Sequence, residues 1–205
     1  MKKLLFGLLL LSTTSISAQR ACGTMHHQQM LEQQDPKVIQ QRQSIENFTS
    51  QYVINHLNSN NSNRAVITIP VVVHVVYNTA VQNVSDAQIQ TQIDVLNKDF
   101  AKMNADTTKI PAVWKSLAAN TNIQFCLAQR DPNGAATNGI TRTSTTTTSF
   151  IDDDKVKKAS TGGHDAWPSA SYLNLWVCKL GNSLLGYAQF PGGPAATDGV
   201  VITYT

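Results

Sequence analysis

The sequence of 205 residues predicts an α/β fold, with a twisted, mostly parallel five-stranded sheet, an antiparallel edge strand and a crossover helix. Residues 69–77 form a continuous valine-rich run, which is typical of a strand covered on both faces. An amphipathic helix pattern follows over 85–103, and a second apolar strand pattern over 122–128. A strand, a crossover helix and another strand make a unit whose two strands run parallel.

The first 18 residues have the parts of a secretory signal peptide. Lys2 and Lys3 give a positive start, residues 4–11 are an apolar run, and small residues precede the expected cleavage before Gln19. The apolar run is too short to cross a bilayer. We therefore expect a signal peptide over 1–18, a secreted, extracellular protein, and no membrane attachment after the signal is removed.

Residues 19–64 are rich in Gln, Asn and Ser and hold few large apolar side chains. These side chains lie at loosely helical spacings, so the segment can form one or two helices that dock on another body but cannot build its own core. Residues 58–64 are a polar linker without periodicity. We expect a boundary near residue 65 and a folded domain over 65–205.

The helix over 85–103 begins at a capping box made by Ser85 and Gln88. Apolar residues then recur every three or four positions, which predicts one face packed on the sheet. These residues are Ile89, Ile93, Leu96 and Phe100.

The stretch 131–170 gives weaker signals: a turn at 131–134 and a short strand near 139–142. Asp152, Asp153 and Asp154 are compatible with calcium, which prefers clustered carboxylates. Their spacing matches no known calcium loop, and lysines follow directly. We interpret them as the solvated start of a helix and keep calcium as the alternative.

Three more strands are predicted at 173–178, 184–190 and 199–204. The turn between the first two is short, so the strand at 184–190 should run antiparallel to the others, at an edge of the sheet, with Pro191 ending it. The last strand stops together with the sequence. We therefore expect the chain to be the amino-terminal portion of a longer protein.

The net charge of +3 includes the two lysines of the signal peptide, and no basic stripe with interleaved aromatic residues is present. Nucleic-acid binding is therefore not expected. Cys126 and Cys178 lie in predicted strands, either as free buried thiols or as a disulfide pair. Cys22 is then the odd thiol.

No complete active site can be assembled from these residues. The five histidines form no H-E-x-x-H motif, and G-x-S-x-G, P-loop and C-x-x-C motifs are absent from the sequence. His74 lies in an apolar strand and is predicted to be a hydrogen-bonded core residue. His26 and His27 are adjacent, so on a helix they point about 100° apart and cannot chelate one metal well. We assign no catalytic residue.

Residues 20–24, directly after the signal peptide, hold side chains that could bind a metal. The thiolate of Cys22 is a strong zinc ligand, Gly23 lets the backbone pass close to a metal cleft, and Arg20 favours the ionised sulfur. Cys22 could close the open position of a catalytic zinc until its segment is cleaved away. A stray thiol near a mature terminus is the alternative.

Several stretches resemble the bacterial pappalysin-family metallopeptidases, which are metzincins. They are 20–24, 69–77, 122–134, 161–168 and 173–201, with L-G-Y-A-Q-F-P-G over 185–192 as the most specific match. The resemblance runs from about residue 20 to the last residue. It implies that 19–64 is a prosegment with its linker, and that 65–205 is the upper subdomain of a metallopeptidase domain, truncated at its C-terminal end.

The resemblance also implies a mechanism. A helix with the motif H-E-x-x-H-x-x-G-x-x-H, expected beyond Thr205, would hold zinc, and a metal-activated water would attack the peptide bond. Cys22 would keep the precursor latent until an activating protease removes the prosegment. A protein or peptide substrate would add as an antiparallel strand along Gly186, Tyr187, Ala188, Gln189 and Phe190. The chain lacks the zinc motif, so we expect it to be inactive by itself.

A non-catalytic exported binding or adhesion module on a related α/β scaffold is the alternative. It predicts that no histidines at zinc spacing follow Thr205. A cysteine hydrolase built on Cys22 is disfavoured, because no histidine is reliably placed beside it and its segment lacks a core to hold a base.

Overall fold

The computed structural model describes residues 20–56 and 65–205. The predicted signal peptide at 1–18 and most of the polar linker, residues 57–64, lie outside the described residues. Among the helices of the described part, none is long and apolar enough to cross a membrane.

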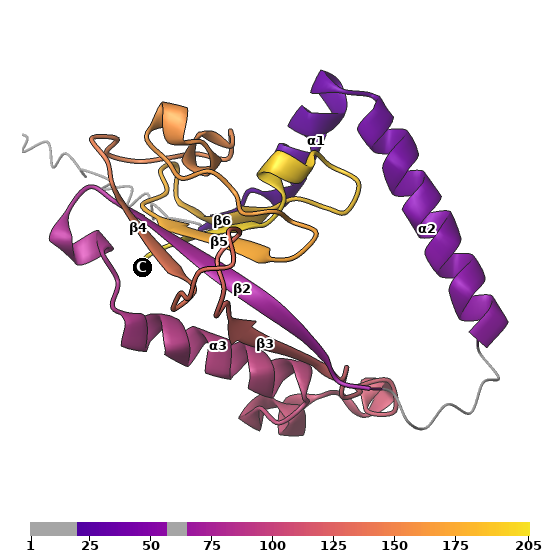
Figure 1. Cartoon of the computed structure of the whole chain (residues 1–205). Helices are drawn as coiled ribbons and strands as arrows, with labels where there is room; N and C mark the ends of the chain where they lie inside the picture. The colour runs from indigo at the N-terminus through magenta and orange to yellow at the C-terminus, as the bar shows by residue number, and fades with distance from the viewer. Residues whose placement is uncertain (1–19, 57–64) are drawn as a thin grey trace, which may run out of the picture.

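A seven-stranded sheet forms the centre of the molecule (Figure 1). Its strands run in the order β1-β6-β7-β5-β2-β3, and β4 pairs with β2. The strands are β1 Ala21–Cys22, β2 Ile67–Tyr77, β3 Ile123–Leu127, β4 Ile140–Ser144, β5 Leu173–Cys178, β6 Leu184–Ala188 and β7 Val200–Thr203. The helices are α1 Thr24–Gln34, α2 Lys37–His56 and α3 Asp86–Phe100, with short 3₁₀ turns at Ala80–Gln82, Ala105–Lys109, Ala112–Trp114, Lys155–Lys157, Ala159–Thr161 and Ala195–Thr197.

The predicted fold class is confirmed. All pairings among β2, β3, β4, β5 and β7 are parallel, and β6 runs antiparallel to β7. The sheet has more strands than the five predicted, because β1 and β4 also join it. The eleven-residue β2 has room for both of its short neighbours on one side: β3 pairs with Ile67 to Val71, and β4 with Val73 to Tyr77.

The predicted edge position of the strand near 184–190 is wrong in one respect. β6 would be the edge of a sheet built from residues 65–205 alone, but β1 from the N-terminal segment lies beside it. An exposed edge strand leaves N–H and C=O groups unpaired, and a short added strand satisfies them. The segment expected to dock on another body therefore docks by extending the sheet.

Helix α3 covers one face of the sheet (Figure 1). Ser85 caps it as predicted, accepting a hydrogen bond from the Gln88 N–H at 3.2 Å. Ile89 and Ile93 pack against Val73 and Val75 of β2 in the first hydrophobic core. This arrangement confirms the helix that the periodicity predicts, although α3 ends at Phe100 rather than near 103.

The other face of the sheet is covered by the long connection between β4 and β5 and by α1. Its core contains Val156, Trp176, Cys178, Tyr187 and Val201, all at most 2% exposed. Helix α2 projects away from this body (Figure 1) and buries only Val38.

Candidate functional site

The N-terminal segment occupies the free side of β6. Ala21 lies beside Leu184 and Cys22 beside Gly186, and the two strands run parallel. The Gly23 N–H donates to the Gly186 carbonyl at 2.8 Å. The Ala188 N–H donates to the Thr24 hydroxyl at 3.1 Å. The Gly186 carbonyl and the Ala188 N–H, which face away from β7, are therefore already bound.

Gly23 permits the close approach of the N-terminal segment, and Gly186 permits the close approach of β6 to β7. A Cβ at Gly23 would lie 3.1 Å from both Asp152 Oδ2 and a methyl group of Leu184. A Cβ at Gly186 would lie 2.5 Å from the Val201 carbonyl oxygen, so the small residue is needed for the β6–β7 pairing itself.

The five residues predicted to bind substrate do not share one environment. Gly186, Tyr187 and Ala188 lie in β6, and the other two follow its end. The Tyr187 side chain is buried, and Tyr187 lies opposite Val201 in the pairing of β6 with β7. The Gln189 side chain donates to the Pro194 carbonyl and accepts from the Thr197 hydroxyl. The ring centre of Phe190 lies 5.0 Å from the guanidinium carbon of Arg42 in α2. A substrate-binding role for them remains a prediction.

Cys22 is exposed at the end of β1 and has a free thiol. Its sulfur lies 3.3 Å from the Thr24 hydroxyl oxygen. Hydrogen bonds from the Thr24 hydroxyl and backbone N–H stabilise the thiolate and lower the pKa of Cys22. Cys126 and Cys178 are also free, so the alternative of a disulfide between them is not realised.

The residues present do not by themselves make a zinc site. Within 20–56 and 65–205, no group of three or more His, Cys, Asp or Glu side chains could hold a metal ion. Cys22 is the ligand that the N-terminal segment could contribute, and a tetrahedral zinc needs more.

Two adjacent histidines fasten α1 to the body of the domain. His26 Nδ1 lies 2.7 Å from Asp152 Oδ2, and His27 Nε2 lies 2.9 Å from Asp154 Oδ2. The divergence that prevents the two rings from chelating one metal lets each reach its own carboxylate. The interpretation of Asp152 and Asp154 as a solvated helix start is wrong, because they are only 8% and 5% exposed.

The third carboxylate of this run is also paired. Asp153 lies 2.8 Å from Lys155 Nζ near the surface. In this arrangement each aspartate of 152–154 is bound to a basic side chain rather than turned toward a shared cation. The calcium alternative remains a prediction.

Lys157 is a buried ammonium group, 1% exposed, behind Asp154. Its Nζ lies 2.8 Å from Asp154 Oδ1 and donates to the Thr197 carbonyl at 2.7 Å. It also lies 4.9 Å from the ring centre of Tyr187. Burial raises the pKa of Asp154, but the hydrogen bond from His27 and the charge of Lys157 outweigh it, and the net pKa is lowered. Burial lowers the pKa of Lys157 against the opposing effect of Asp154.

His74 has the structural role that its strand predicts. It is fully buried, with Nδ1 2.8 Å from the Thr141 hydroxyl and Nε2 3.0 Å from the Asn174 amide oxygen. Its ring stacks on His164 at 4.4 Å. Burial lowers its pKa to about 4, so it is neutral at physiological pH.

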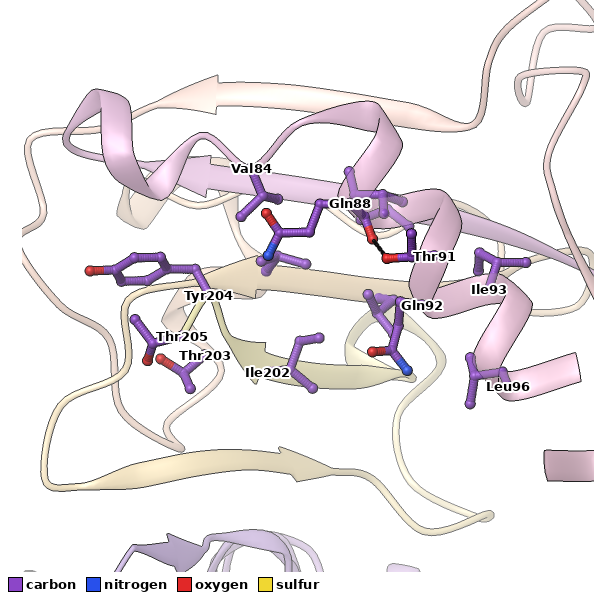
Figure 2. A pocket seen from close by; sticks show the side chains of 14 residues that line it. Val84, Gln88, Thr91, Gln92, Ile93, Leu96, Ile202, Thr203, Tyr204 and Thr205 are labelled. Atoms are coloured by element: carbon purple, nitrogen blue, oxygen red, sulfur yellow. Dashed lines mark hydrogen bonds between the residues drawn. The ribbon is translucent and has the colours of Figure 1, made fainter. Parts of the chain in front are cut away.

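A pocket of about 310 Å³ lies between α3 and the sheet (Figure 2). Val84, Ile93 and Leu96 line one side of it, and Leu175, Val177 and Ile202 the other. Its lining holds no His, Cys or charged side chain. The pocket faces away from Tyr187 and Trp176, whose side chains belong to the core on the opposite face of the sheet. The pocket is a space that α3 leaves open on this face of the sheet, and its lining offers no catalytic group.

Comparison with known proteins gives structural neighbours. No family model and no curated relative matches this chain. Mirolysin in complex with compound 9 is 58% identical with a TM-score of 0.66, and mature mirolysin of Tannerella forsythia in complex with a cleaved peptide is 57% identical with a TM-score of 0.67. Each match covers 69% of this chain and 54% of the mirolysin chain.

A mutant of Tannerella forsythia promirolysin is 50% identical, with a TM-score of 0.75, and the match covers 90% of this chain and 60% of that one. The chain thus spans 54–60% of the length of these structures. The chain is similar in both sequence and fold to mirolysin and promirolysin.

Proposed function

We propose that this chain belongs to the precursor of a secreted, zinc-dependent metallopeptidase of the pappalysin family of metzincins. The observation that carries the proposal is the 50–58% identity to mirolysin and promirolysin, together with an N-terminal segment that pairs with β6. Mature mirolysin was solved with a cleaved peptide, which supports a protein or peptide substrate for this chain as well.

We assign residues 19–64 to the prosegment and linker, and 65–205 to the upper part of the peptidase domain. The matched share rises from 69% of the chain for mature mirolysin to 90% for promirolysin, a gain of about 43 of the 205 residues. The segment 19–64 has a similar length. A signal peptide at 1–18 and an activating protease that removes the prosegment complete this proposal.

Removal of the prosegment would open the edge of β6. The Gly186 carbonyl and the Ala188 N–H would lose their partners at Gly23 and Thr24, and an extended peptide could replace them through backbone hydrogen bonds. We expect that peptide to run antiparallel to β6. Because β1 runs parallel to β6, the prosegment lies in the reverse direction and does not present its own bonds as a substrate would.

The metal would need ligands from polypeptide that the longer relatives have outside the matched region. Cys22 is the ligand that we assign to this part of the protein, as the group that keeps the precursor latent. Its lowered pKa favours the thiolate, which is the form that binds zinc.

The test uses a precursor extended to the length of promirolysin. Cys22→Ala should hydrolyse a fluorogenic peptide before prosegment cleavage, whereas the matched variant Cys126→Ala should stay latent. Unchanged latency in Cys22→Ala would show that Cys22 does not keep the precursor latent. If the processed protein cleaves no peptide, the proposed peptidase activity is refuted and the non-catalytic binding module is favoured.

A further inference from the structure

The loop between β3 and β4, residues 128–139, contains two asparagine–glycine pairs, Asn133 with Gly134 and Asn138 with Gly139. Asparagine followed by glycine is prone to spontaneous loss of the side-chain amide, because glycine puts no side chain in the way when its backbone nitrogen attacks the asparagine side-chain carbonyl. The two pairs are chemically identical and lie in one loop. The fold gives them different surroundings.

The first pair lies at the tip of an exposed turn. Pro132, Asn133 and Gly134 are all exposed, and the Gly134 N–H donates to the Asp131 carbonyl at 2.9 Å. Among the described residues, 20–56 and 65–205, no partner binds the side-chain amide of Asn133. A Cβ built on Gly134 would meet nothing within 4 Å, so this backbone has room to move. One hydrogen bond in an open turn therefore restrains the nitrogen that would attack.

The second pair is held at both of its reacting groups. Asn138 Nδ2 donates to Asp86 Oδ2 at 3.3 Å, and Asn138 Oδ1 accepts from the Ile140 N–H at 3.2 Å. The Gly139 N–H donates to the Thr137 hydroxyl at 3.1 Å. Gly139 is buried, and a Cβ there would lie 2.6 Å from another backbone nitrogen. Ring closure at Asn138 would have to break three hydrogen bonds in a packed site.

We propose that Asn133 is a modification site, at which the folded chain converts asparagine to isoaspartate and aspartate, while Asn138 is protected. The Gly134 nitrogen gives up its proton and bonds to the side-chain carbonyl carbon of Asn133, and the bond from that carbon to the amide nitrogen breaks. Ammonia leaves with the proton, and a cyclic succinimide remains. Water then adds to either ring carbonyl and opens the ring, to isoaspartate or to aspartate. Water is the only co-reactant, and nothing is oxidised or reduced.

Isoaspartate at this position would loosen the turn and leave the sheet in place. Its main chain runs through the β-carbon, so the N–H groups of residues 133 and 134 would lose their present bonds to Asp131. On either side of the loop, β3 and β4 remain paired with β2. In the strand order of the sheet, β3 lies at the opposite end from β1 and β6. The modification is therefore independent of the prosegment and of the proposed peptidase.

The experiment compares the two pairs within one chain. The full chain is incubated at mildly alkaline pH, and the tryptic peptide 131–142, which contains both asparagines, is sequenced by mass spectrometry with electron-transfer fragmentation. We expect Asn133 to convert at least about tenfold faster than Asn138, with isoaspartate among the products, because opening an exposed turn costs less free energy than opening a packed one. In urea the two rates should agree within about twofold, because the unfolded chain removes the difference in surroundings.

The measurement in urea is the control that separates the fold from the dipeptide. A native ratio of rates no larger than the ratio in urea overturns the proposal, as does faster conversion of Asn138 in the native chain. The same holds if Asn133 stays intact in the native chain over the time in which the unfolded chain converts. Aspartate without isoaspartate at position 133 would exclude the cyclic route and would also overturn the proposal.

Discussion

Replacing Asp154 by asparagine tests the buried charge cluster that fastens α1 to the domain. Asparagine keeps the shape and tolerates the left-handed backbone, φ +61°, at this position. The change removes the carboxylate bonded to Lys157, which is 1% exposed, and leaves the more weakly acting charge of Asp198. Removing one partner of a buried pair costs about 3–5 kcal/mol, and because the asparagine oxygen still accepts one hydrogen bond we expect about 3 kcal/mol.

The matched control is Asp153→Asn in the same loop. Its ion pair with Lys155 has side chains 21% and 63% exposed, so its loss should cost at most about 1 kcal/mol. Urea unfolding followed by circular dichroism gives both free energies of unfolding, and hydrogen exchange of the α1 amides should rise only in Asp154→Asn. Equal free energies for the two variants, with unchanged m-values, would refute the reasoning.

Three further outcomes are expected. Gly163→Ala should destabilise the chain by about 2 kcal/mol or more in urea unfolding, since its Cβ would lie 2.0 Å from a backbone carbonyl oxygen, whereas Gly181→Ala, with 3.4 Å to its nearest neighbour, should be nearly neutral. His74 has a folded-state pKa of about 4 against 6.5 unfolded, so the unfolded chain binds the extra proton and stability falls by about 3 kcal/mol as the pH drops from 6.5 to 4; an NMR midpoint near 6.5 would contradict this. A thiol reagent should label Cys22 in the native chain but Cys178 only after unfolding, because burial raises the pKa of Cys178 to about 12.

Local pattern was enough to predict most of the fold. The valine run of β2 and the spacing of Ile89 and Ile93 in α3 reflect burial, which the sequence records residue by residue. β1 escapes such a prediction, because two residues carry no periodicity and its partner β6 lies more than 160 residues away. Because β1 pairs with β6, β6 is not the edge strand of the sheet.

The contacts of His26 and His27 with Asp152 and Asp154 could not be predicted for a similar reason. His26 and Asp152 are 126 residues apart in the chain, and neither belongs to a motif of fixed spacing. An aspartate run followed by lysines usually indicates a solvated surface, and only the tertiary fold turns Asp154 and Lys157 inward. The prediction of Cys22 as a candidate ligand came from residue chemistry and resemblance, and the structure adds its position beside Gly186.

Zinc-edge X-ray absorption of the latent precursor, extended to the length of promirolysin, tests the central claim most directly. We expect one sulfur ligand at about 2.3 Å from the metal, lost in Cys22→Ser and after removal of residues 19–64. A latent precursor whose zinc has no sulfur neighbour, or whose sulfur signal persists in Cys22→Ser, would contradict it.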